Sequence, residues 1–200
     1  DGSGKGTQAK LLAKHLTVTD HLVREITFPD YDSDSSALVK MYLAGQFGQH
    51  PDDVNAYAAS SFYAVDRYAS FLRFWRKDYL SGATIVADRY TTSNAVYQME
   101  KTPREDWNKY LAWLQDYEYG KLQLPRPDLV LFLDMPTEIS QRLLSGRYAG
   151  DEEFLTRCRR TALYAAEAMG WHTVSCSQEG APRKIEDIQR DIREIVSQKL

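Results

Sequence analysis

The spacing of apolar residues along the chain predicts a series of helices. Apolar side chains recur at steps of three and four, which is typical of a helix with one apolar face. The longest such run begins at Pro51 and ends before Gly82, with an apolar stripe that includes Val65, Leu72 and Trp75. The predicted helices cover about residues 9–16, 38–43, 51–80, 138–144, 154–169 and 185–195, together with two stretches that split near Pro103.

Short apolar segments between these helices predict strands. They cover residues 22–28, 83–87, 128–134 and 171–176, and segment 128–134 is apolar on both faces, as in a buried parallel strand. Strands that alternate with helices predict an α/β fold with a parallel sheet covered by helices on both sides. We therefore expect one three-layer domain over residues 1–200, with a sheet of about five strands.

The composition indicates which kinds of partner and which kinds of site the chain is expected to lack. The chain has 200 residues, 43% of them hydrophobic, and a formal net charge of −3 with acids and bases interspersed. We therefore expect no nucleic acid partner, and no apolar run approaches the roughly 18 residues that a membrane span needs. Cys158 and Cys176 lie outside any close Cys/His cluster, so we expect free thiols in a reducing cytoplasm rather than a disulfide or a zinc site.

The first seven residues form a glycine-rich segment that predicts a phosphate-binding loop. Gly2, Gly4 and Gly6 allow a tight curve whose backbone N–H groups converge on one point. Lys5 adds a positive charge, and Thr7 offers a hydroxyl to phosphate or Mg²⁺. Gly6 stands where Ser or Thr usually follows the lysine, a variation also seen in adenylate kinases. A glycine-rich turn that merely feeds a helix is the alternative, and a phosphate loop alone is shared by kinases, switches, motors and passive binders.

The start of the chain lies inside this loop. A phosphate loop of this kind follows an apolar strand and one further glycine. We therefore expect the first strand of the sheet to precede Asp1 and to be absent from the sequence.

Several further motifs, in order along nearly the whole chain, resemble the thymidylate kinase family. They are the segment 1–7, Phe28-Pro29, Asp66-Arg67, Asp88-Arg89-Tyr90 with Ser93 and Tyr97-Gln98, and the segment 131–134. The Asp-Arg-Tyr segment with its downstream Ser and Tyr-Gln is the most discriminating. The resemblance implies a P-loop kinase fold with acceptor-binding helices at about residues 33–80 and a lid at about residues 142–156.

The resemblance also implies site residues. For ATP they are Gly2, Ser3, Gly4, Lys5, Gly6, Thr7 and Arg142, with Arg142 packing on adenine. For dTMP they are Asp1, Phe28, Pro29, Tyr63, Arg67, Arg89, Ser93, Tyr97 and Gln98. The expected catalytic residues are Lys5, Asp88, Arg89 and Arg147. Thr7 and Asp88 are expected to bind Mg²⁺, directly or through water. Arg157, Arg159 and Arg160 are further candidates for reaching the transferring phosphoryl group.

Within the dTMP set the resemblance implies distinct roles. Arg89 is expected to bind the acceptor phosphate and Arg67 to donate to the thymine O4. Tyr63 is expected to stack on the ring, and Tyr97 to lie against the sugar, where a ribose 2′-hydroxyl would be unwelcome. Ser93 and Gln98 are expected along the base, and Asp1 near the 3′-hydroxyl.

Structural explanations compete with several of these roles. Asp66 and Arg67 could be solvated charges on a long helix, and Tyr63 could be a core residue. Asp88-Arg89 could be an ion pair at a strand end, and Asp134 could only hold structure beneath the loop.

Two features depart from the family pattern. Where related kinases often have an arginine two residues after the Phe-Pro proline, this chain has Tyr31, and Lys40 or a lid arginine could replace it. The lid segment is also short, so we expect either a small lid or a stretch that is absent from the sequence.

The predicted function is the ATP-dependent phosphorylation of dTMP to dTDP, a step toward dTTP, by a homodimer that pairs through helix 51–80. The alternatives are a kinase for another nucleoside monophosphate or a deoxynucleoside, and a nucleotide-binding module without activity.

Overall fold

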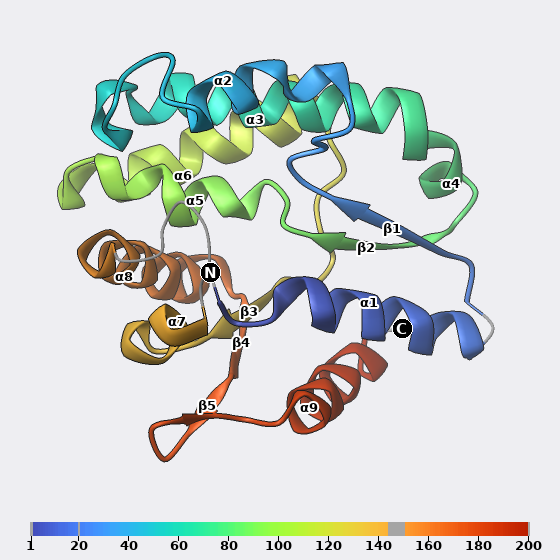
Figure 1. Ribbon diagram of the computed structural model, residues 1–200. Coiled ribbons are helices and arrows are strands. Elements are labelled where there is room, and N and C mark those ends of the chain that lie inside the picture. The colour runs from blue at the N-terminus through green and yellow to red at the C-terminus, as the bar shows by residue number, and fades with distance from the viewer. Residues whose placement is uncertain (1, 20, 144–150, 200) are drawn as a thin grey trace. The chain divides into compact units, whose positions relative to one another are not determined.

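The structure, a computed structural model, describes residues 2–19, 21–143 and 151–199 (Figure 1). Its contacts group into two compact units. The terminal unit comprises Asp1–Asp20 and Pro127–Leu200, and the central unit comprises His21–Arg126. The single domain predicted over residues 1–200 stays a prediction, and each unit is described by itself.

The terminal unit combines one parallel strand pair with helices. Its elements are α1 (Lys5–Val18), β3 (Leu131–Asp134), α7 (Thr137–Leu143), α8 (Glu152–Met169), β4 (His172–Ser175), the short antiparallel pair β5 (Ser177–Gln178) and β6 (Ala181–Pro182), and α9 (Ile185–Ser197). β3 and β4 pair in parallel from Leu131↔His172 to Asp134↔Ser175. α9 packs against α1 through a stripe with buried Ile188, Ile192 and Val196.

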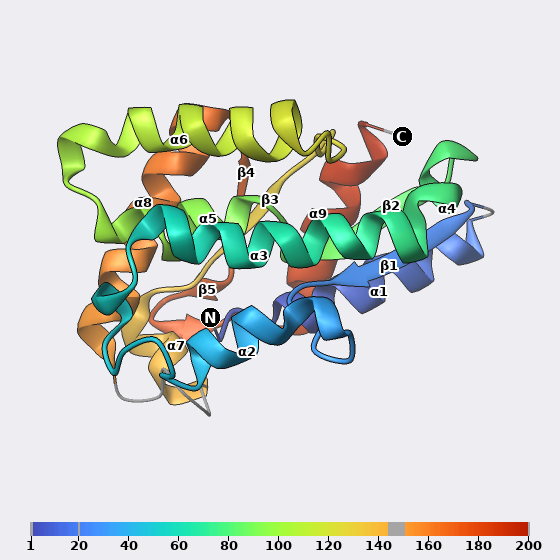
Figure 2. The ribbon, with the colours of Figure 1, turned by 90° about the horizontal axis from the view of Figure 1, so that it is seen from above.

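The central unit holds a second parallel pair and the helices that follow each strand. Its elements are β1 (Val23–Thr27), α2 (Ala37–Leu43), α3 (Ala56–Ser70), a π-helical turn (Phe71–Trp75), α4 (Arg76–Leu80), β2 (Thr84–Asp88), α5 (Thr92–Tyr97), α6 (Trp107–Gln115) and a π-helical segment (Asp116–Lys121), with short 3-10 turns at Asp34–Ser36, Pro51–Asp53, Met99–Lys101 and Arg104–Asp106. β1 and β2 pair from Val23↔Thr84 to Thr27↔Asp88. α2 runs alongside α3 (Figure 2).

An aromatic cluster forms part of the core of the central unit. Phe28, Phe71, Trp75, Tyr90 and Leu124 are buried together, with Ile26 and Ile85 of the two strands packed against them. The cluster therefore anchors the segments that directly follow β1 and β2. Phe28 and Pro29 are joined by a cis peptide bond.

The predicted α/β organisation is confirmed, with parallel pairing of the strands. Among the described residues, β1 pairs with β2 and β3 with β4. A sheet of about five strands and a strand before Asp1 stay predictions.

The predicted start of the long helix at Pro51 is wrong. Pro51–Asp53 is a separate 3-10 turn, and Val54 has an extended backbone. α3 begins only after Asn55, whose side-chain oxygen accepts a hydrogen bond from the Ala58 N–H at 2.9 Å. From there α3, the π-helical turn and α4 continue to Leu80 without a gap.

The apolar stripe of this helix is buried only in part, because Trp75 is 1% exposed and lies in the aromatic cluster while other members face outward. Val65, Tyr68 and Leu72 are 46%, 38% and 49% exposed. The buried face instead includes Ser60, Asp66 and Arg67, which are at most 1% exposed. Polar side chains can occupy this buried face because residues of the central unit form hydrogen bonds and an ion pair with them.

The described helices include none that is long and apolar enough to cross a membrane.

Candidate functional site

The glycine loop at the start of α1 has the backbone expected of a phosphate cradle. Gly2 and Gly4 have φ values of 74° and 79°, in the left-handed region that glycine adopts without strain. Gly4 caps α1 without a side-chain hydrogen bond, and the Gln8 N–H makes the first intrahelical bond, to the Gly4 carbonyl at 3.0 Å. The N–H groups of residues 5–7 therefore precede the helical ladder and can donate to an anion.

The charges around this end of α1 also suit an anion. The first turn of α1 has no acidic residue, and Lys5 begins the helix. Burial, together with the charge of Asp134, raises the pKa of the Cys176 thiol to about 11, while the charges of Arg183 and Lys5 oppose the rise. Lys5 thus acts near the ends of β3 and β4. Thr7 is exposed, Ser3 is buried, and both cysteines are buried free thiols, as predicted.

Asp134, which ends β3, is held by an arginine of α8. Arg159 donates from Nε to Asp134 Oδ1 at 2.7 Å and from Nη2 to Oδ2 at 2.9 Å. This pairing raises the pKa of Arg159. The geometry fits a structural role for Asp134, and it directs the Arg159 guanidinium toward the end of the strand.

The other lid candidates lie apart from this pair or outside the described residues. Arg142 is exposed in the last turn of α7. Arg157 pairs with Glu153 one turn earlier in α8, at 2.9 Å. Arg147 and Asp1 lie outside the described residues, so their predicted roles stay predictions.

Arg89 follows β2 directly and adopts an unusual backbone. Its φ is 64°, which is uncommon for a residue other than glycine and recurs at functional sites. Its half-buried guanidinium lies 5.1 Å from the centroid of the Tyr97 ring. Burial lowers the pKa of Arg89, but Tyr97, Asp88 and Tyr63 more than offset this, so the net shift is upward. The charge is therefore retained in a partly dry setting, where an anion would be bound strongly.

Two buried oxygens, one in the residue before Arg89 and one in the residue after Tyr97, lack a hydrogen-bond partner within the described ranges. One is Oδ1 of Asp88, and the other is Oε1 of Gln98, whose side chain is only 3% exposed. An unsatisfied buried polar atom costs about 1–3 kcal/mol. Ligand binding would remove this cost. The carboxylate oxygen of Asp88 is also the kind of hard donor that Mg²⁺ prefers, so this residue fits that ion.

The remaining residues predicted to bind dTMP in the central unit are Phe28, Pro29, Tyr63 and Ser93. The Phe28 N–H donates to the Asp88 carbonyl at 3.2 Å, which places Phe28-Pro29 beside the end of β2. Tyr63 is half-buried on α3, and its ring meets that of Tyr42 edge-on with 6.4 Å between centroids. Ser93 is half-buried on α5.

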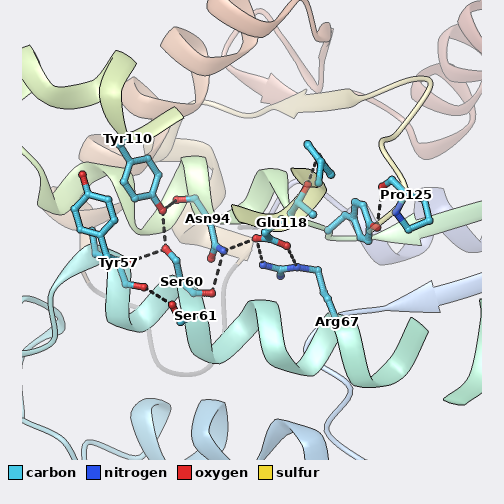
Figure 3. A network of polar contacts seen from close by, with 12 residues as sticks. Tyr57, Ser60, Ser61, Arg67, Asn94, Tyr110, Glu118 and Pro125 are labelled. Atoms are coloured by element: carbon cyan, nitrogen blue, oxygen red, sulfur yellow. Dashed lines mark hydrogen bonds and ion pairs between the residues drawn. The ribbon is translucent and has the colours of Figure 1, made fainter. Parts of the chain in front are cut away.

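Asp66 and Arg67 are both 1% exposed, so the alternative that they are solvated surface charges is wrong. Asp66 accepts hydrogen bonds from the Asp30 N–H at 2.9 Å and the Ser35 hydroxyl at 2.5 Å. Arg67 forms a two-pronged ion pair with Glu118, from Nε to Oε2 at 2.7 Å and from Nη2 to Oε1 at 2.6 Å (Figure 3). Burial lowers the pKa of Arg67, but Glu118 outweighs it and the net shift is upward.

Glu118 was not among the residues predicted from the sequence. This residue is 0% exposed and lies in the π-helical segment after α6. A signal was present, because Glu118 continues the three- and four-residue spacing of Tyr110, Leu111 and Leu114, which are buried in α6. An acid on the buried face of a helix requires a cationic or hydrogen-bonding partner.

The segment after Pro29 contains Tyr31, which stands in place of the family's arginine, and Lys40 lies close to it. Lys40 donates from Nζ to the backbone carbonyls of Tyr31 at 3.2 Å and Ser33 at 3.4 Å. Burial raises the pKa of the Tyr31 hydroxyl, and the charge of Arg89 opposes the shift. Lys40 and Tyr31 therefore lie close together in the central unit. A role for Lys40 in binding phosphate stays a prediction.

Comparisons with known proteins agree with these motifs. A family model described as thymidylate kinase matches residues 1–192. The chain is 30% identical to a probable thymidylate kinase of Thermococcus gammatolerans, over 100% of this chain and 93% of that protein. It is 28% identical to a thymidylate kinase of Mycobacterium tuberculosis, over 86% of this chain and 84% of that protein. It is 27% identical to a thymidylate kinase of Homo sapiens, over 96% of this chain and 84% of that protein.

Proposed function

The chain belongs to the thymidylate kinase family, and from this premise we propose that it transfers the γ-phosphoryl group of ATP to dTMP, giving ADP and dTDP. The observation that supports this most strongly is Arg89. Its charge is kept half-buried at the end of β2 beside Tyr97, and the adjacent residues Asp88 and Gln98 each have a buried oxygen without a hydrogen-bond partner among the described residues.

The acceptor needs no strong general base. The second pKa of a phosphate monoester is near ~6, so the attacking oxygen of dTMP is largely deprotonated at neutral pH. The main task is to bind two polyanions and to compensate the charge of a loose transition state. Lys5 and the N–H groups of the glycine loop would bind the ATP phosphates, and Arg89 would bind the acceptor phosphate. Arg142 would pack on adenine, and Arg147 would add charge when the lid closes.

Mg²⁺ would be held by Thr7 and Asp88, directly or through water. When bound, the ion neutralises phosphate charge and orients the phosphates. The free Oδ1 of Asp88 supports this assignment.

The thymine base would be bound by residues of the central unit. Arg67 would donate to O4, and Tyr63 would stack on the ring. The free Oε1 of Gln98 is a natural acceptor for the N3–H of thymine. Ser93 would also lie along the base, and Tyr97 would lie against the sugar.

The activity is tested by steady-state assay of the purified chain with MgATP and a panel of monophosphates. We expect dTDP as the main product, with dUMP, dCMP and AMP used poorly. Faster turnover of another monophosphate would identify a different kinase. ATP binding without any diphosphate formed would identify a module that binds nucleotide but has no activity.

We also propose that the protein forms a homodimer through α3 and the π-helical turn. Val65, Tyr68, Leu72 and Phe74 there are each 38–49% exposed although all are large and apolar. A face of this kind on a helix is typical of a protein interface.

The two buried free thiols are in keeping with a protein of the cytoplasm.

A further inference from the structure

We propose that Glu118 is a positioning residue for the acceptor base. In this proposal, Glu118 fixes the Arg67 guanidinium so that its remaining edge favours a carbonyl over an amino group at the 4-position of a pyrimidine. The inference rests on the proposed function, because it requires that Arg67 contacts the base.

The ion pair fixes the orientation of the guanidinium. Glu118 engages Nε and Nη2, which form one edge of the planar group. Within the described residues, the hydrogen bonds of this guanidinium go to Glu118 alone, so the N–H groups of Nη1 are left for a ligand. Since both side chains are at most 1% exposed, water does not compete for the two hydrogen bonds between Arg67 and Glu118. Rotation of Arg67 would break two short charge-assisted bonds.

Glu118 is itself held by a second side chain. Asn94 of α5 donates from Nδ2 to Glu118 Oε1 at 3.0 Å and to the Ser60 carbonyl of α3 at 3.3 Å. The Tyr110 hydroxyl of α6 donates to the Asn94 carbonyl at 3.2 Å and is within 2.6 Å of the Ser60 hydroxyl. The network therefore joins α3, α5, α6 and the π-helical segment (Figure 3). Asn94 also directly follows Ser93, one of the residues expected along the base.

This arrangement presents donors and withholds acceptors. Nη1 of arginine has only N–H groups, which suit the O4 of thymine and clash with the amino group of cytosine. Glu118 could accept a hydrogen bond from such an amino group if its carboxylate were free. Oε1 already receives Nη2 and Asn94, and Oε2 receives Nε, so the carboxylate is committed to its present direction. The preference thus depends on Glu118 although it would not touch the substrate.

The experiment compares Glu118→Gln with the wild-type protein and with Tyr110→Phe. The glutamine keeps the size of the side chain but removes its charge and places an amide N–H₂ against the guanidinium. Tyr110→Phe removes a hydroxyl from the same buried network and leaves the Arg67–Glu118 pair intact, so it controls for loss of stability alone. KM and kcat are measured with dTMP and dCMP, and the melting temperature is measured for each protein with and without dTMP.

For Glu118→Gln we expect KM for dTMP to rise about tenfold or more while kcat stays within about threefold. We expect the ratio of kcat/KM for dTMP over dCMP to fall about tenfold, and dTMP to stabilise the variant less than the wild type. For Tyr110→Phe we expect a lower melting temperature with KM and the ratio unchanged. If Glu118→Gln does not fold, Glu118→Asp, which keeps the charge but shortens the reach, should show the same shifts in KM and ratio.

A variant with a lower melting temperature but with KM and the dTMP/dCMP ratio within about twofold of the wild type would show that the pair only holds the helices together. A wild-type protein that forms no dTDP in this assay would overturn the proposed function and this inference with it. A wild-type protein that forms dTDP, combined with unchanged variants, overturns this inference alone.

Discussion

Replacing Arg89 by alanine should reduce turnover of dTMP about a hundredfold or more while the fold survives. The guanidinium is half-buried beside Tyr97, where water screens its charge only weakly. Loss of one such positioned donor typically costs about 2.7–4 kcal/mol in the transition state, which is about 10²–10³ in rate. The cost to stability should be smaller, because the contact with the Tyr97 ring contributes only about 0.5–1 kcal/mol.

The backbone at this position supplies a matched control. Alanine keeps the strain of a φ near 64°, whereas glycine relieves it. Arg89→Gly should therefore be more stable than Arg89→Ala by about 1 kcal/mol, yet equally slow. Arg89→Lys should recover only part of the rate, because a point charge lacks the fork of the guanidinium.

The assay couples ADP formation to a spectroscopic signal, with dTDP checked by chromatography and unfolding followed in urea. A folded Arg89→Ala protein whose kcat/KM for dTMP stays within about threefold of the wild type would refute the role of Arg89. A glycine variant that is faster than the alanine variant would show that backbone strain, rather than the missing charge, limits turnover.

Three further outcomes are expected. Lys5→Ala should also lower turnover about a hundredfold or more with little change in the circular dichroism spectrum, and unchanged turnover would exclude Lys5 from the ATP phosphates. Leu72→Arg should shift a dimer toward monomer in sedimentation velocity, because it places a charge on the exposed apolar face of the π-helical turn; an unchanged sedimentation coefficient would argue against pairing there. The pKa of Cys176 is raised by burial to about 11, so the folded state holds its proton more tightly than the unfolded state. The free energy of unfolding should therefore fall as the pH rises from about 9 to 11, and less steeply in Cys176→Ala; equal slopes would contradict the shift.

Local patterns were sufficient to predict most elements of the fold. The three- and four-residue spacing predicted α3, α6, α8 and α9, and the split near Pro103 separates α5 from α6 as expected. The start of the long helix was misplaced because Pro51 opens a short 3-10 turn rather than the helix itself. The glycines at 2, 4 and 6 were expected to allow a tight curve, and Gly2 and Gly4 do adopt left-handed backbone there.

The buried polar side of the candidate site could not be predicted in the same way. Hydrophobic periodicity assigns polar residues to solvent, yet Arg67 is buried because Glu118, 51 residues further along the chain, neutralises it. Spacing within one helix contains no information about such a distant partner.

The buried Arg67–Glu118 pair has a consequence for how the sequence can diverge. Removing one partner leaves an uncompensated charge in the interior, at a cost of about 3–5 kcal/mol, which is a large part of the stability of an ordinary domain. Single substitutions at either position should therefore be purged by selection. Lineages that change one of the two should carry a compensating change at the other, and often at Asn94 as well.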